Sequence, residues 1–163
     1  MTLAVHAIIG AAIGHQIGFH SPTALLLAGG ATHYISDAIP DWDWRLSSFS
    51  SEEKGSWRWV FISGAFAKNI ARVVLDGVLG IAVVLLIAQP ASTETAIALL
   101  LAAFGGMTPD FLQGIYFTGY APFLAPLQRF HDFCHTKIKL GPYPLIGIPF
   151  QIVIALAAIY FLR

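Results

Sequence analysis

The sequence predicts an all-α fold: a polytopic membrane bundle of about five short transmembrane helices plus an interfacial helix, in a single domain covering residues 1–163. Apolar residues make up 56% of the chain and charged residues 11%, against roughly 45–50% and about 25% in soluble domains. Mean hydropathy is +0.71. Apolar stretches of nearly membrane-spanning length recur along the chain, separated by breaks that contain proline.

The five expected helices are the apolar stretches, each near the roughly 17–25 residues that cross the hydrocarbon core. They are residues 3–19, 23–39, 71–88, 95–117 and 145–162. The first two carry polar residues and could instead be tilted or re-entrant. A tryptophan-rich segment follows the second stretch, and an interfacial helix is expected at residues 51–68. Gly10, Gly14 and Gly18 stand four apart, which predicts a close packing face.

Composition also excludes some classes of function. The formal net charge is zero, so the basic surface of a nucleic-acid-binding protein is not expected and nucleic acid is excluded as a partner. Cys134 is the only cysteine, which rules out an internal disulfide and argues against a thiolate metal site.

The distribution of charge predicts an orientation. If five helices cross the membrane, the N-terminus and the loops at residues 40–70 and 118–144 share one side, and these loops hold most of the Lys and Arg residues. The positive-inside rule makes that side cytoplasmic. The same assignment gathers most of the potential metal ligands near that side: Asp37, Asp41, Asp43, Asp76, Asp110, Asp132, His6, His33, His131 and His135.

Two of these acids, Asp76 and Asp110, fall inside apolar helices, where an unpaired carboxylate costs roughly 2.5–3.5 kcal/mol. A neighbouring group must offset the cost of burying these two carboxylates. Hydrogen bonds from serine or threonine, or an ion pair with Arg72, would be a structural solution. A shared cation would explain the acids and the histidines together.

The most specific motif is the run from His33 to Asp43. His33 and Asp37 are four residues apart on a helix, so their side chains share one face, and Asp41 and Asp43 follow the helix-ending Pro40. Mixed imidazole and carboxylate ligands suit a divalent metal, zinc first, with manganese or magnesium as alternatives. The other interpretation is a helix end with solvated aspartates.

A second motif holds His131 and His135, again four apart, with Asp132 between them. Two histidines at this spacing can chelate one ion from one face of a helix. The segment could instead be interfacial and bind nothing. His15 and His20 lie toward the opposite end of the first helix and are given a structural role.

These elements resemble the integral membrane metal-dependent hydrolases, a family that is similar in turn to zinc-dependent phospholipase C. The resemblance implies hydrolysis of a phosphoric ester through water activated by metal. The positions that carry it are His6, His33 with Asp37, Asp41 with Asp43, and His131 with His135.

The expected function is therefore a membrane-embedded hydrolase that acts on a phosphoester, either a small molecule or a lipid headgroup, with membrane lipid as its partner. Asp41 or Asp132 would accept the proton from water. The expected metal ligands are His6, His33, Asp37, Asp43, Asp76, Asp110, His131 and His135.

Three alternatives remain open. The first is an intramembrane metalloprotease, because His131-Asp132-x-x-His135 is similar to the zinc-protease motif and Leu75-Asp76-Gly77 to a third-ligand element. The second is a metal-ion or proton transporter, because acids inside a membrane often mark ion pathways. The third is a purely structural membrane protein.

Overall fold

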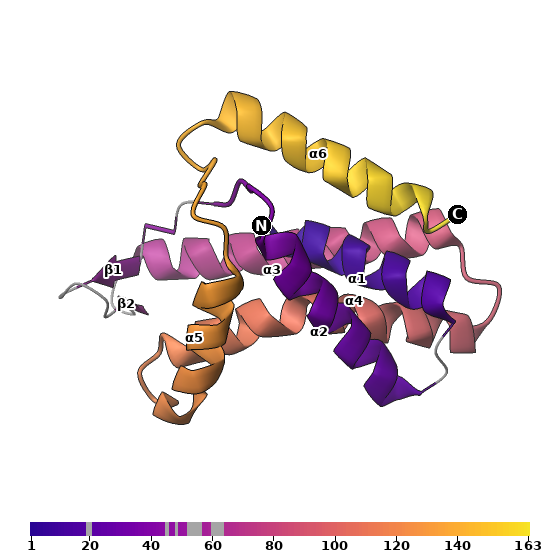
Figure 1. Cartoon of the computed structure of the whole chain (residues 1–163), viewed down its shortest axis with the longest axis horizontal. Helices are drawn as coiled ribbons and strands as arrows, with labels where there is room; N and C mark the ends of the chain where they lie inside the picture. Colours follow the sequence, from indigo (N-terminus) through magenta and orange to yellow (C-terminus); the bar gives the residue numbers. More distant parts are fainter. Residues whose placement is uncertain (19–20, 45, 48, 52–56, 60–63) are drawn as a thin grey trace.

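The computed structural model describes residues 1–18, 21–44, 46–47, 49–51, 57–59 and 64–163 (Figure 1). This part of the chain is helical apart from one short antiparallel ribbon. In chain order the elements are α1 (Leu3–Ile17), α2 (Pro22–Asp37), β1 (Phe49–Ser51), β2 (Trp57–Trp59), α3 (Gly64–Ala88), α4 (Thr93–Tyr116), the single-turn 3-10 helix η1 (Pro122–Leu124), α5 (Ala125–Cys134) and α6 (Pro144–Tyr160).

All five apolar stretches form helices, but not all are long. Among the described helices, only α3 and α4 are long and apolar enough to cross a membrane, and their most apolar stretches have mean hydropathies of 2.5 and 1.5. The helices α1 and α6 are apolar but shorter. A bundle with two candidate spans is therefore observed, and the expectation of five spans is not confirmed.

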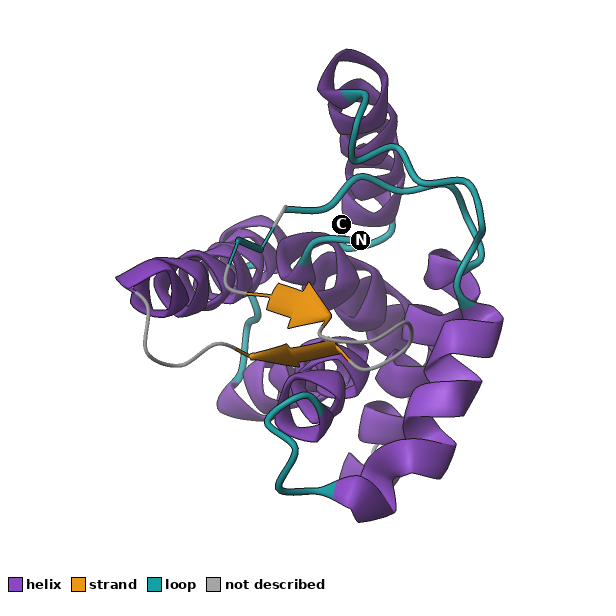
Figure 2. Ribbon diagram, turned by 90° about the vertical axis from the view of Figure 1, so that its left-hand side faces the viewer, coloured by secondary structure: helices purple, strands orange, loops and turns teal. Residues whose placement is uncertain are grey.

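The interfacial helix expected at residues 51–68 is wrong at residues 51 and 57–59, which form strands. β1 pairs with β2 in antiparallel register, Phe49 opposite Trp59, and residues 64–68 already belong to α3. Residues 52–56 and 60–63 lie outside the described part. Aromatic residues favour extended backbone, and this preference is consistent with a ribbon. Figure 2 views the molecule from the end that carries it.

Small residues let α4 pack tightly against α1 and α2 at once. A Cβ added to Gly10 of α1 or to Gly29 of α2 would collide with the backbone carbonyl of Ala102, and one added to Gly106 would collide with the carbonyl of His6. The packing role predicted for Gly10 and Gly14 is confirmed. Gly18 differs, because it ends α1 in the left-handed conformation with φ 65°.

The segment after α5 is held against the end of α2. The Thr136 amide donates to the Asp37 carbonyl at 2.7 Å, and the Leu140 amide donates to the Asp41 carbonyl at 3.0 Å. Residues 136–140 therefore lie along residues 37–41, and Asp41 and Lys139 form an isolated parallel bridge there. This attachment holds α5 beside the C-terminal end of α2.

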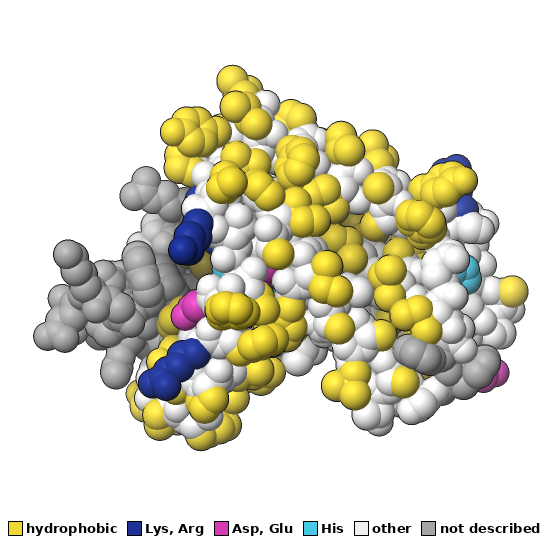
Figure 3. Space-filling view, viewed as in Figure 1, with side chains coloured by type: hydrophobic (Ala, Val, Ile, Leu, Met, Phe, Trp, Pro, Cys, Tyr) yellow, Lys and Arg dark blue, Asp and Glu magenta, His cyan; other side chains and the backbone are white. Residues whose placement is uncertain are grey.

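Much of the outer surface is apolar. Hydrophobic side chains cover the length of α6 in Figure 3. On α3, Leu75, Val78, Leu79 and Leu86 are each at least half exposed, and Leu145 at the start of α6 is 91% exposed. Large contiguous apolar surfaces are unusual on soluble monomers, so this surface is compatible with contact with lipid.

Candidate metal centre

Six potential ligands converge where α1, α2, α4 and α5 meet. They form three overlapping groups whose ligand atoms lie within 4.8 Å of one another, and these groups could hold a metal ion. The six side chains are His6 of α1, His33 and Asp37 of α2, Asp110 of α4, His131 of α5 and His135 at the end of α5. We call this set the His/Asp cluster.

The centre of the cluster has the dimensions of a tetrahedral site. Asp37 Oδ2 lies 3.0 Å from His33 Nε2 and 2.9 Å from His131 Nε2, and the two nitrogens are 3.1 Å apart. Asp110 Oδ1 lies 3.7 Å from both nitrogens. Ligands that each sit about 2.0–2.1 Å from a tetrahedral zinc ion are about 3.3 Å from one another. The distances given above, from 2.9 to 3.7 Å, lie on both sides of that value.

The hydrogen bonds of His33 and His6 determine which ring nitrogens are free to bind a cation. His33 Nδ1 lies 2.7 Å from the Gly106 carbonyl, which can only accept, so Nδ1 carries the hydrogen. Ser36 Oγ donates to the His33 carbonyl and therefore accepts from His6 Nδ1 at 3.2 Å. In both rings the lone pair is left on Nε2, which faces the carboxylates. Metal-binding histidines are typically oriented in this way.

This arrangement leaves buried acceptors facing each other. His6 Nε2 and Asp37 Oδ1 are 3.2 Å apart, and within the described part of the chain neither atom has a hydrogen-bond partner. Both residues are almost fully buried. Buried polar atoms without partners are rare and costly, and two lone pairs at this distance repel unless a proton or a metal cation lies between them. A divalent cation would remove this repulsion, so the residues present fit a metal.

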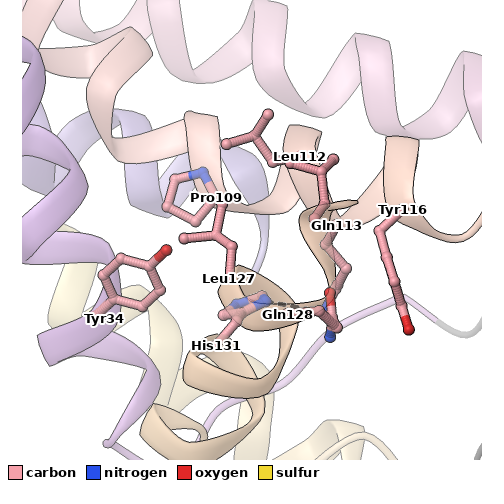
Figure 4. Close-up of a pocket in the computed structure, with 9 residues that line it drawn as sticks. Tyr34, Pro109, Leu112, Gln113, Tyr116, Leu127, Gln128 and His131 are labelled. Carbon is pink, nitrogen blue, oxygen red and sulfur yellow. Dashed lines mark hydrogen bonds between the residues drawn. The ribbon is translucent and has the colours of Figure 1, made fainter. Parts of the chain in front are cut away.

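His131 is oriented by a residue that the sequence analysis did not single out. The Gln113 side-chain amide lies 2.9 Å from His131 Nδ1, drawn as a dashed line in Figure 4. The atom placed there is Gln113 Nε2, which donates to His131 Nδ1 and so leaves the hydrogen of the neutral ring on His131 Nε2, 2.9 Å from Asp37 Oδ2. A flip of the amide would turn its oxygen toward Nδ1 and free His131 Nε2 for a cation. The signal available in the sequence was an amide three residues after Asp110 in an apolar helix. A cavity of about 10 Å³ beside it has space for about one water.

His135 has a different environment. The Lys139 ammonium lies 2.8 Å from His135 Nδ1, and an ammonium can only donate, so the hydrogen of the neutral ring is on Nε2. That nitrogen lies 3.6 Å from Asp37 Oδ2. Burial lowers the pKa of His135 from 6.5, against the opposing effect of Asp37. His135 is therefore arranged as a neutral hydrogen-bond donor at the edge of the cluster.

The amino group of Met1 is buried beside the same carboxylates. It pairs with Asp41 Oδ2 at 2.5 Å and lies 3.7 Å from Asp37 Oδ1. Burial alone would lower the pKa of this amino group, but the surrounding carboxylates, Asp43 and Asp41 first, raise it from 8.0 to about 10. Asp41 is thus brought next to the His/Asp cluster without joining it.

Besides Asp41, three expected site residues lie outside the cluster. Asp76 accepts the Ala4 amide at 3.2 Å and so caps the start of α1. Asp43 Oδ1 accepts the Trp44 amide at 2.6 Å. Asp132 is exposed and accepts from the Gln128 side chain at 2.8 Å.

Arg72 and His15 are not members of the His/Asp cluster. The guanidinium of Arg72 stacks over the Trp44 ring, 5.1 Å from the ring centroid. This contact replaces the ion pair with a buried aspartate that the sequence suggested. His15 is exposed near the opposite end of α1, in keeping with its omission from the predicted site. His20 lies outside the described residues.

No protein-family model matches the chain, and searches of the curated proteins and of the solved structures return no match. The function must therefore follow from the chemistry of the His/Asp cluster and its surroundings.

Proposed function

We propose that this protein is a metal-dependent hydrolase of phosphoesters that acts at a membrane surface. The observation that carries the proposal is the buried pair of His6 Nε2 and Asp37 Oδ1, which lie 3.2 Å apart and have no hydrogen-bond partner among the described residues. Zinc is the metal that best matches a small set of nitrogen and oxygen ligands, with manganese or magnesium as alternatives.

The cluster has an open side from which a substrate could approach. The Asp110 side chain is 25% exposed, whereas the side chains of Asp37 and His33 are almost inaccessible. Catalytic metal sites keep one position free of protein ligands, in contrast to closed structural sites. The direction of approach is therefore past Asp110.

A divalent cation in this cluster would polarise a phosphoryl oxygen and promote the ionisation of water. In the hydrolysis, a water oxygen bonds to phosphorus, the ester P–O bond breaks, and the proton lost by water is available for the departing alkoxide. Asp41 is the better placed of the two expected proton acceptors. Its buried side chain lies beside the Met1 amino group, as that of Asp37 does, whereas Asp132 is exposed. His135 Nε2 can donate a hydrogen bond to a phosphoryl oxygen.

The membrane assignment rests on α3 and α4, and on the exposed apolar surfaces of α3 and α6. We infer that the centre lies at the cytoplasmic face of a prokaryotic inner membrane, because the loops around it carry the excess of Lys and Arg. Intramembrane proteolysis is less well supported. It requires the histidine pair inside a membrane helix, whereas α5 has only 10 residues and His135 lies beyond its end.

Metal analysis of the purified full-length chain tests the proposal. We expect the wild type to retain a divalent metal and Asp37→Asn to lose it, while Asp132→Asn, which alters an exposed aspartate outside the cluster, retains it. The metal-loaded protein should hydrolyse p-nitrophenyl phosphoesters in detergent and stop when the metal is chelated. A folded wild type that binds no divalent metal would refute the proposal.

A further inference from the structure

An apolar groove lies between α3 and α4 beside the His/Asp cluster. It encloses about 660 Å³, within the roughly 300–1,000 Å³ typical of small-molecule sites. Its walls are formed mostly by hydrophobic side chains: Ile70, Val73 and Val74 from α3, and Phe104, Met107 and Phe111 from α4. A groove of this composition excludes a strongly polar occupant along most of its length.

Polar residues also line the groove, and two of them reach the cluster. Asp110 lines the groove and is also a member of the cluster, with Oδ1 3.7 Å from His33 Nε2. Gln113 lines the groove as well and holds His131 Nδ1 at 2.9 Å. A ligand in the groove would therefore have one end next to the proposed cation while its body contacts apolar side chains.

The charges beside the cluster constrain the ligand further. Asp43, Asp76 and Asp110 line the groove together with Met1, whose amino group is paired with Asp41, so without a metal ion the excess of negative charge would repel an anionic group there. A bound divalent cation would reverse that preference for a phosphate. The apolar part of the groove is thus complementary to a hydrocarbon tail. The part beside the cluster is complementary to a phosphate head only when metal is present.

We propose, on the basis of the proposed function, that this groove binds the hydrocarbon tail of a long-chain phosphoester and delivers its phosphate to the His/Asp cluster. The substrate class is then an amphiphile, not a small water-soluble ester. The tail leaves the bilayer and enters the protein between α3 and α4.

Two positions in the groove allow it to be filled without touching the cluster. Among the described residues, no atom lies within 4 Å of a Cβ added to Gly114, so Gly114→Phe adds a ring to the groove lining without a clash with those residues. Val74 lines the groove and is 56% exposed, while Val78, one turn further along α3, is 59% exposed and does not line it. Val74→Phe therefore fills the groove, and Val78→Phe is its matched control outside the groove.

The test compares p-nitrophenyl hexadecyl phosphate with p-nitrophenyl methyl phosphate, using the metal-loaded full-length protein in mixed micelles. We expect wild-type kcat/KM to favour the long chain. Gly114→Phe and Val74→Phe should lower kcat/KM for the hexadecyl ester by about tenfold, since displacing two or more methylenes from an apolar site has that effect. Both variants should leave the methyl ester within about twofold, and Val78→Phe should change neither. Equal losses for the two esters, or an equal loss in Val78→Phe, would overturn the proposal.

A binding measurement keeps this proposal separate from the proposed function. Hexadecyl phosphate with a diazirine in its chain should label α3 and α4 in the presence of metal, and Gly114→Phe should abolish that labelling. If neither ester is hydrolysed but the labelling follows this pattern, the hydrolase assignment fails and the tail-binding groove stands. Labelling outside α3 and α4, or labelling unaffected by Gly114→Phe, refutes the groove.

Discussion

Hydrogen-bond partners on the outer side of each imidazole divide the histidines of the cluster into two kinds. The carbonyl of Gly106 and the hydroxyl of Ser36 accept hydrogens from His33 and His6, which leaves lone pairs on the inner nitrogens. Lys139 donates to His135 and leaves a hydrogen there instead. Residues of the same type and similar spacing thus differ in their ability to bind a cation, because metal binding needs a free lone pair.

This difference predicts unequal effects of two alanine substitutions. His33→Ala removes a central ligand and should weaken metal affinity by about 100-fold or more. His135→Ala removes a hydrogen-bond donor at the edge, so metal affinity should change by less than about tenfold while hydrolysis of a phosphoester falls. Competition with a chromophoric chelator measures the affinities. Equal weakening by the two substitutions would show that His135 is a ligand like His33.

At the scale of helices, the position of the cluster depends on how closely α2 approaches α4. Gly29 faces the backbone of Ala102 and Gly106, and His33 lies one turn further along the same helix, with its Nδ1 bonded to the Gly106 carbonyl. Close packing of the glycines therefore brings the imidazole to its acceptor. The neighbouring Gly30 has only the Gly105 carbonyl nearby, at 3.7 Å from an added Cβ.

We therefore expect opposite effects from two adjacent Gly→Ala substitutions in α2. Gly29→Ala should destabilise the protein by about 1–3 kcal/mol through overpacking, and should reduce metal affinity by displacing His33. Gly30→Ala should be neutral or stabilising by up to about 1 kcal/mol, because alanine favours the helix more than glycine does. Thermal unfolding in detergent and metal titration check both effects. Similar stability for the two variants would mean that the α2–α4 approach is not tight.

At the scale of the whole molecule, a cation would link two helices near the start of the chain to two helices in its second half. His6, His33, Asp110 and His131 come from α1, α2, α4 and α5. Without a cation, the Asp37 and Asp110 carboxylates face inward-pointing lone pairs at a buried position. A ligand that binds only the folded state stabilises that state according to its concentration and affinity.

Removal of the metal should consequently lower the melting temperature. A cation at 100 times its dissociation constant contributes about 2.7 kcal/mol to stability, which corresponds to a shift of about 5 °C or more in a protein of this size. The circular dichroism of the helices should remain after chelation, because their hydrogen bonds do not involve the metal. Melting curves with and without chelator, followed by zinc addition, provide the measurement. Identical curves would indicate that no cation stabilises the fold.

The proposed orientation of the molecule can be tested with its single cysteine. Cys134 is partly exposed on α5, next to the cluster. A membrane-impermeant maleimide should label it in inside-out vesicles and not in intact cells. In the Cys134→Ser background, Ala91→Cys, an exposed position in the turn between α3 and α4, should show the reverse pattern. Labelling of Cys134 from outside would invert the assignment.

Local features of the molecule were predictable from sequence because they depend on spacing along one element. Apolar composition located the five helices, and the four-residue separation of His33 and Asp37 placed Nε2 and Oδ2 on one helical face, 3.0 Å apart. The glycines of α1 likewise indicated a close contact. These outcomes depend on helical periodicity, which any helix shares.

The tertiary contacts separated the expected ligands into those that meet and those that do not. Asp76 and Asp110 had the same sequence signature, yet one caps α1 and the other faces His33. Gln113 and the Gly106 carbonyl, which orient two imidazoles, carried no distinctive pattern. Such contacts join residues that are distant in the chain, so they depend on the crossing of whole helices, which the periodicity of a single helix does not encode.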